Sequence, residues 1–140
     1  MQLRRPDEDS EQGQTLGFSA AEMKNRPFLA RLGFALAGLR IVAQRERSFR
    51  TQSALALIPV AVTGLVGPGL VWAAIILMTI ALVLAFEMMN AALEYLTDQV
   101  HPEHAAEIKH AKDASAGAVL VTSIASACIG AMMLLSVLLR

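Results

Sequence analysis

Long uncharged stretches are the feature of this chain that most constrains its fold. No charged residue occurs between Arg50 and Glu87, and none occurs over residues 114–139. Runs of this length suit the hydrocarbon core of a bilayer, which a helix of about 20 apolar residues crosses. Inside a bilayer only helices and closed barrels satisfy their backbone hydrogen bonds. The sequence therefore predicts an all-α integral membrane protein.

Three membrane-spanning helices fit these apolar runs. The first is expected at about residues 50–66, where a proline interrupts a short apolar stretch, the second at about 70–98 and the third at about 108–139. A Gly-Pro-Gly sequence between the first two runs predicts a turn. The second helix should continue past Phe86, because the Met, Ala and Leu residues that follow are good helix formers.

Basic residues are concentrated before the apolar runs. Nine of the twelve Lys and Arg precede residue 51, and residues 28–48 combine leucines at helical spacing with arginines. This pattern predicts an amphipathic helix at the membrane interface. Residues 1–26 are polar and acidic, and we expect a disordered cytoplasmic tail there, before a membrane-embedded domain over residues 27–140. The positive-inside rule places the N-terminus in the cytoplasm.

The third apolar run carries small residues at every fourth position. These residues are Ala114, Ala118, Thr122, Ser126 and Gly130. Small residues along one side of a membrane helix let another helix approach closely. We therefore expect this small-residue stripe to be a packing face, within the subunit or between subunits.

A row of polar residues continues the second apolar run. Glu87, Asn90, Glu94 and Asp98 are spaced by three, four and four residues, so they project from one face of a helix. Ionisable groups at membrane depth are costly and mark function by default. Such a row could bind a metal, accept a proton or carry ions.

Each acid also has a plainer interpretation. Glu87 lies deepest and is the candidate general base, but it could instead reach water or pair with a buried arginine. Glu94 and Asp98 could hold a cation between them, or form a solvated helix end. Glu46 stands between two arginines, where it could balance charge or supply another oxygen to a divalent ion.

Lys112 opens the third helix and could hold a polyphosphate as a point charge, although lysines also serve as ordinary interfacial anchors. The sequence contains no phosphate-binding P-loop, no dinucleotide fingerprint and no kinase catalytic-loop motif. His101, His104 and His110 have no zinc-type spacing with cysteine. Any phosphate transfer would therefore not use a soluble-kinase fold.

Taken together, these motifs resemble those of the small bacterial diacylglycerol kinase family, which includes the undecaprenol kinases. The likeness covers roughly residues 28–139. It is carried by the segments 87–94 (EMMNAALE) with Asp98, 111–113 (AKD) with 116–119 (AGAV), 34–40 (FALAGLR) and 45–50 (RERSFR). The acidic and AKD motifs are specific in combination. One departure is that the family often has Glu-Tyr-His in the second loop, where residues 103–105 read EHA.

The resemblance implies a homotrimeric bundle of three-span subunits with composite active sites at the subunit contacts. Glu87 matches the catalytic base, and Glu46 and Glu94 match the ligands of the Mg²⁺ that accompanies ATP. The positions that match the surroundings of the nucleotide are Asn90, Asp98, Glu103, Lys112 and Asp113. Ser48 and Arg50 fall in a region that is expected to touch the lipid substrate.

The implied activity is ATP- and Mg²⁺-dependent phosphorylation of a membrane lipid alcohol in the bacterial cytoplasmic (inner) membrane. Diacylglycerol, which would give phosphatidic acid in phospholipid metabolism, is the favoured substrate, and undecaprenol is the alternative. Another class is a small membrane transporter subunit in which Glu87 carries a proton or binds a cation. A third is an inactive assembly partner bound through the small-residue stripe. The net charge of zero gives no field that would recruit nucleic acid.

Overall fold

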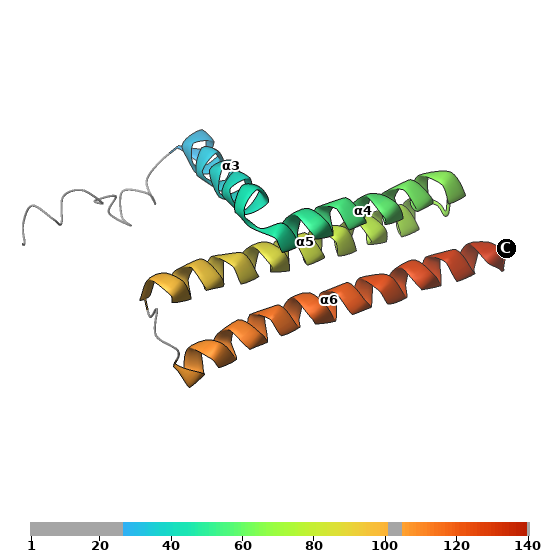
Figure 1. The fold of residues 1–140 in the computed structure, drawn as a ribbon. Coiled ribbons are helices and arrows are strands. Elements are labelled where there is room, and N and C mark those ends of the chain that lie inside the picture. Colours follow the sequence, from blue (N-terminus) through green and yellow to red (C-terminus); the bar gives the residue numbers. More distant parts are fainter. Residues whose placement is uncertain (1–26, 101–104, 140) are drawn as a thin grey trace, which may run out of the picture. The chain divides into compact units, whose positions relative to one another are not determined.

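A computed structural model of the protein describes residues 27–100 and 105–139. The described chain forms four helices, which are α3 (Phe28–Arg45), α4 (Arg47–Val66), α5 (Leu70–Val100) and α6 (Ala106–Leu138) (Figure 1). The last three are each long and apolar enough to cross a membrane. The predicted all-α architecture with three candidate spans is therefore confirmed. The tail assigned to residues 1–26, and Glu103 in the second loop, lie outside the described residues.

The packing of the chain divides it into two units, residues 1–38 and residues 39–140. The described part of the first unit is the beginning of α3, where Phe28, Leu29 and Leu36 are exposed. Exposed apolar side chains near arginines suit a helix at a membrane surface, and the interfacial position remains a prediction. The second unit contains the end of α3 and the three long helices, and the candidate site lies within it.

The helix predicted over residues 28–48 is interrupted at Glu46. α3 ends one residue before Glu46 and α4 begins one residue after it, and Glu46 itself is extended, with φ −90° and ψ 116°. The Arg50 guanidinium donates a 2.8 Å hydrogen bond to the carbonyl oxygen of Gln44. This bond satisfies one of the carbonyls left open at the end of α3. Ser48 therefore belongs to the first candidate span, and Glu46 lies at the corner before it.

The first candidate span, α4, reaches 20 residues although Pro59 lies inside it. Its start at Arg47 supplies the length that the apolar stretch alone lacks. Gly67 caps its C-terminal end with a left-handed φ of 60°, and the Gly67 N–H donates to the carbonyl oxygen of Thr63 at 3.1 Å. Gly69 also has a positive φ, 101°, so the predicted turn between the first two spans depends on two glycines.

α5 is the central helix of the second unit, because it packs along α6 and also against α4. Figure 1 shows α5 and α6 running side by side over most of their length. The Thr63 hydroxyl of α4 lies 3.6 Å from the sulfur of Met133 on α6, which joins the first and third spans. The buried apolar side chains are Val42, Phe49, Ile76, Val83, Ala91, Val119 and Met133.

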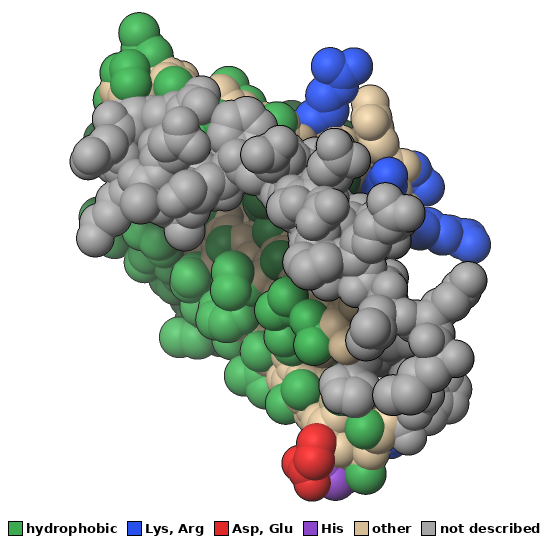
Figure 2. Space-filling model, turned by 90° about the vertical axis from the view of Figure 1, so that its left-hand side faces the viewer, with side chains coloured by type: hydrophobic (Ala, Val, Ile, Leu, Met, Phe, Trp, Pro, Cys, Tyr) green, Lys and Arg blue, Asp and Glu red, His purple; other side chains and the backbone are tan. Residues whose placement is uncertain are grey.

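Most large apolar side chains of the described helices are exposed. Leu57, Met78 and Ile124, one from each long helix, are 67%, 63% and 56% exposed. Figure 2 shows apolar side chains over much of the described surface on one face. Contiguous apolar surface of this extent marks contact with a membrane or with other proteins, and it agrees with the membrane assignment.

The small-residue stripe on α6, predicted to be a packing face, is only partly covered by other helices of the described chain. Its first residue, Ala114, is exposed, and the other four are half-buried. At its far end Ser126 and Gly130 line a cavity, and a Cβ atom added to Gly130 would meet nothing within 4 Å. Close helix contact within the described chain therefore does not extend to that end, and contact between subunits stays a prediction.

Candidate active site

The polar end of α5 holds the acidic row on one rigid element. α5 continues without a break to Val100, as predicted, because no helix-breaking residue follows the apolar run. Glu87 is 5% exposed, Asn90 and Glu94 are half-buried, and Asp98 is exposed. The row therefore leads from a buried carboxyl group to a solvent-facing one over three helical turns.

Glu87 is the deepest acid of the row. It extends the buried face of α5 that includes Thr79 and Val83. No residue in 27–100 or 105–139 donates a hydrogen bond to its carboxylate, and none of the described arginines pairs with it. Among the described residues only the Ser123 hydroxyl oxygen is fully buried without a partner, so the Glu87 oxygens reach the accessible surface of the chain. A carboxylate with accessible oxygens and no protein donor is available to accept a proton from a bound hydroxyl group.

A hydrogen-bonded chain links α5 to α6 next to this carboxylate. The Asn90 amide nitrogen donates to Glu94 Oε1 at 2.9 Å, and the Asn90 amide oxygen accepts from the Ser115 hydroxyl at 2.6 Å. The two bonds fix which way the amide points and hold the Glu94 side chain. Ser115 was not among the predicted site residues, and its position one turn after Lys112 on α6 was the only signal.

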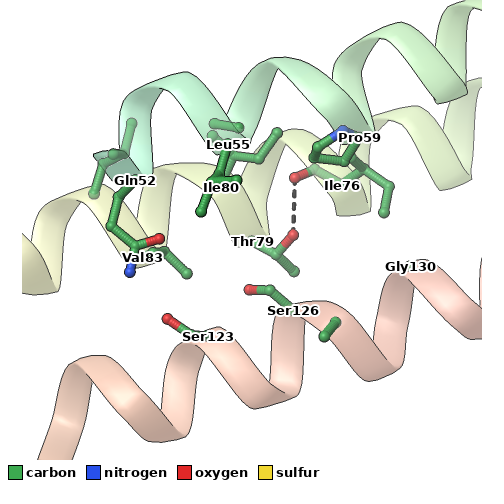
Figure 3. A pocket seen from close by; sticks show the side chains of 13 residues that line it. Gln52, Leu55, Pro59, Ile76, Thr79, Ile80, Val83, Ser123, Ser126 and Gly130 are labelled. Atoms are coloured by element: carbon green, nitrogen blue, oxygen red, sulfur yellow. Dashed lines mark hydrogen bonds between the residues drawn. The ribbon is translucent and has the colours of Figure 1, made fainter. Parts of the chain in front are cut away.

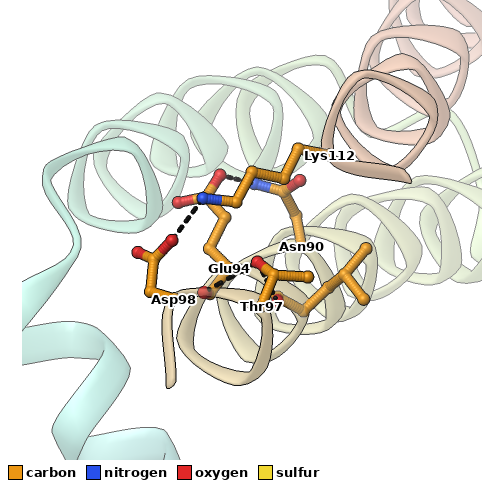
Figure 4. A network of polar contacts seen from close by, with 6 residues as sticks. Asn90, Glu94, Thr97, Asp98 and Lys112 are labelled. Atoms are coloured by element: carbon orange, nitrogen blue, oxygen red, sulfur yellow. Dashed lines mark hydrogen bonds and ion pairs between the residues drawn. The ribbon is translucent and has the colours of Figure 1, made fainter. Parts of the chain in front are cut away.

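Lys112 and Asp98 form an ion pair between the start of α6 and the end of α5. Figure 4 shows Asn90, Glu94, Asp98 and Lys112 close together at this end of the two helices. The Lys112 side chain is 34% exposed and that of Asp98 is 65% exposed. The sequence predicted all four as site residues, and the structure brings them together with a positive charge beside the acids.

Asp113 does not join this network. Its carboxylate pairs instead with Lys109, with 2.7 Å between Lys109 Nζ and Asp113 Oδ2. The Lys109 side chain is 75% exposed and the Asp113 side chain is 62% exposed. Ion pairs between exposed side chains contribute little to stability. Of the five predicted nucleotide positions, three belong to the observed cluster and Asp113 does not, while Glu103 lies outside the described residues.

Glu46 is connected to the same end of α5 by a residue that sequence reasoning missed. The Tyr95 hydroxyl donates a 2.5 Å hydrogen bond to Glu46 Oε1, and Tyr95 directly follows Glu94. Tyr95 also packs against the buried apolar cluster formed by Val42, Phe49 and Ala91. It is the only tyrosine of the chain, and that rarity was the available signal.

The two predicted lipid contacts lie at the start of α4. Ser48 and Arg50 are both exposed. Arg50 lines an open hollow of about 500 Å³ together with Arg47 and Thr51. Cationic and hydroxyl side chains at the end of a membrane helix suit a lipid headgroup region, and no described contact joins them to Glu87.

The donor chemistry fits a magnesium ion that is bound mainly through phosphates. Magnesium commonly takes one or two carboxylates, several waters and substrate phosphates, rather than a cage of protein ligands. Within the described ranges no three His, Cys, Asp or Glu side chains gather as a metal site. Glu46 and Glu94 each use Oε1 in a hydrogen bond, and the described residues leave the second oxygen of each unbonded.

Comparison with known proteins identifies the family. The family described as prokaryotic diacylglycerol kinase matches residues 33–134. A diacylglycerol kinase from Synechocystis sp. is 32% identical over 107 residues, which cover 76% of this chain and 61% of the relative, so the chain spans less than two thirds of that relative's length. An undecaprenol kinase from Bacillus subtilis is 33% identical over 98 residues, covering 70% of this chain and 80% of the relative. The chain belongs to the prokaryotic diacylglycerol kinase family.

Proposed function

We propose that this protein is a membrane-embedded lipid kinase that transfers the γ-phosphoryl group of ATP to the hydroxyl group of a membrane lipid. The observation that carries the proposal is Glu87, a 5% exposed acid without a hydrogen-bond partner among the described residues, one turn from a fixed cluster of Asn90, Glu94, Asp98 and Lys112. A lipid hydroxyl reaches such a boundary laterally, whereas ATP arrives from water. Family membership supports the same reaction class.

In the proposed reaction the lipid oxygen attacks the γ phosphorus and a new oxygen–phosphorus bond forms. The bond from the γ phosphorus to the oxygen that bridges to the β-phosphate breaks, and ADP leaves. Glu87 takes the hydroxyl proton and returns it to water after the transfer. Positioning and charge stabilisation provide most of the acceleration in phosphoryl transfer.

The remaining side chains position the nucleotide. Lys112 supplies positive charge toward the phosphates. Asn90, which bonds to Glu94, and Asp98, which pairs with Lys112, are further nucleotide contacts. Glu46 and Glu94 would hold Mg²⁺, which when bound neutralises the charge of the β- and γ-phosphates. We include Glu103 and Asp113 as nucleotide contacts on the resemblance alone; in the observed fold Asp113 is paired with Lys109.

We propose diacylglycerol as the lipid, with undecaprenol as the second candidate. The two relatives are named for these two substrates and are 32% and 33% identical, so the comparison does not separate them. Ser48 and Arg50 at the start of α4 would contact the headgroup region. We further propose a homotrimer in the bacterial cytoplasmic membrane, with the N-terminus and the acidic cluster on the cytoplasmic side. The excess of Lys and Arg before residue 51 supports that orientation.

The test is a phosphorylation assay of purified protein in mixed micelles, with labelled ATP, Mg²⁺ and the two lipids offered side by side. We expect labelled phosphatidic acid from the wild-type protein. The Glu87→Gln variant should assemble normally and lose at least about 100-fold in kcat, because a general base commonly contributes about 10²–10⁴-fold. Full activity in Glu87→Gln would remove this residue as the base. Proton or cation flux without a lipid product would instead favour the transporter interpretation.

A further inference from the structure

A cavity of about 360 Å³ lies between α4, α5 and α6, within the second unit. Its wall is mostly apolar, and the polar side chains that line it are Gln52, Thr79, Ser123 and Ser126 (Figure 3). Ligand pockets in proteins enclose about 300–1,000 Å³ and combine apolar walls with a few placed polar groups. The size and the lining therefore suit the polar part of an amphiphilic molecule with an apolar tail.

Two of the four polar side chains are already used. The hydroxyls of Thr79 and Ser126 donate to carbonyl oxygens of their own helices at 2.9 Å and 2.8 Å. The other two are available. The Ser123 hydroxyl oxygen is buried without a hydrogen-bond partner among the described residues. The Gln52 amide, which points from α4 toward the cavity in Figure 3, also has no partner there.

The cavity lies beside the acid that the proposed function uses as base. Val83 lines the cavity, and Glu87 is one helical turn further on the same buried face of α5, a rise of about 6 Å. On α4, Gln52 follows Ser48 by one turn, so the cavity also continues from the proposed headgroup contact. A molecule with its reacting oxygen at Glu87 could place groups a few bonds away near Gln52.

We propose that this cavity recognises the ester groups of the lipid substrate. Gln52 and Ser123 donate hydrogen bonds to the ester carbonyl oxygens of a diacylglycerol whose free hydroxyl lies at Glu87. The carbonyls are only a few bonds from that hydroxyl, comparable with one helical turn of about 5.4 Å. Undecaprenol has no carbonyl group and would leave both donors unpaired, which is unfavourable in a buried site. This inference rests on the proposed lipid kinase function.

The experiment compares an ester-linked diacylglycerol with the matching ether-linked dialkylglycerol, which keeps the hydroxyl and the tails but lacks both carbonyl oxygens. The measured quantity is the ratio of kcat/KM for the ester to kcat/KM for the ether. Ser123→Ala and Gln52→Leu should each lower this ratio by about 3- to 10-fold, the size expected for one lost hydrogen bond. Ser126→Ala is the matched control, since it removes a hydroxyl from the same cavity whose proton is already bonded. Its ratio should stay within about 2-fold of wild type.

The outcomes separate the inference from the function on which it rests. Equal ratios in Ser123→Ala and Ser126→Ala, or a wild-type enzyme that does not prefer ester to ether, would overturn ester recognition while leaving the kinase activity intact. A wild-type enzyme that phosphorylates undecaprenol but not diacylglycerol would also overturn the ester recognition and leave the kinase activity intact. No product from any lipid, with folded protein, would overturn the proposed function and the ester recognition with it.

Discussion

The Ser115→Ala variant tests whether the link between α5 and α6 positions the active site. The Ser115 hydroxyl lies 2.6 Å from the Asn90 amide oxygen and 3.0 Å from the carbonyl oxygen of Lys112, and the Asn90 amide in turn donates to Glu94. Removal of the hydroxyl leaves the Asn90 amide free to rotate. The Asn90 amide nitrogen can still donate to Glu94, but its orientation is no longer fixed, so the Glu94 side chain is held less firmly.

The expected size follows from one half-buried neutral hydrogen bond, which contributes about 0.5–1.5 kcal/mol. At about 1.4 kcal/mol per factor of ten, kcat/KM for ATP should fall by about 2- to 10-fold in Ser115→Ala. The protein should still fold and insert, because the change is a single small hydroxyl. A double-mutant cycle with Asn90→Ala should give less than the sum of the two single effects, since both remove the same bond.

Ser136→Ala is the matched control for this variant. Ser136 is also half-buried on α6, and its hydroxyl bonds only to the carbonyl oxygen of Met133, at 2.7 Å. Like Ser115 it bonds to a carbonyl oxygen of its own helix, but among the described residues its hydroxyl makes no hydrogen bond to α5. Equal loss of activity in Ser115→Ala and Ser136→Ala, or strict additivity in the cycle, would refute the positioning role.

Three further variants and one control variant test individual contacts. Tyr95→Phe removes the donor to Glu46 and should raise the Mg²⁺ concentration for half-maximal rate by about 2- to 5-fold; an unchanged Mg²⁺ titration would contradict it. Glu94→Ala should shift the same titration further, and an unchanged requirement would count against this residue as a ligand. Lys112→Met should raise KM for ATP by about 10-fold or more, because a charge near the phosphates is lost. Lys109→Met, which removes only an exposed ion pair, should stay within about 2-fold, and equal effects at the two lysines would argue against a specific role.

The spacing of apolar, charged and polar residues along the chain explains which parts of the fold and of the candidate site could be predicted. Uncharged runs of bilayer length predicted three spans, and residues 27–100 and 105–139 contain three helices of that kind. The spacing of Glu87, Asn90 and Glu94 predicted one helical face, and a row that becomes more exposed along α5 agrees with it. The interruption at Glu46 was not predicted, because Arg47 and Ser48 are as compatible with the end of one helix as with the start of the next.

The side-chain contacts between helices could not be predicted from the sequence. Nothing in the pattern distinguishes Lys109 from Lys112 as the partner of Asp98, yet the structure pairs Lys112 with Asp98 and leaves Lys109 to Asp113. The choice depends on the rotation of α6 about its own axis, which only the packing against α5 decides.

The sequence by itself determined the membrane class, the three spans and the face of α5 that carries the acids, because hydrophobicity and helical spacing act over neighbouring residues. Only the tertiary structure decided that Tyr95 meets Glu46 and that Ser115 meets Asn90. It also decided that Ser123, whose hydroxyl has no partner among the described residues, lines a cavity with Val83. Such contacts join residues far apart along the chain. They depend on the register and rotation at which three apolar helices pack, and apolar surfaces alone leave both undetermined.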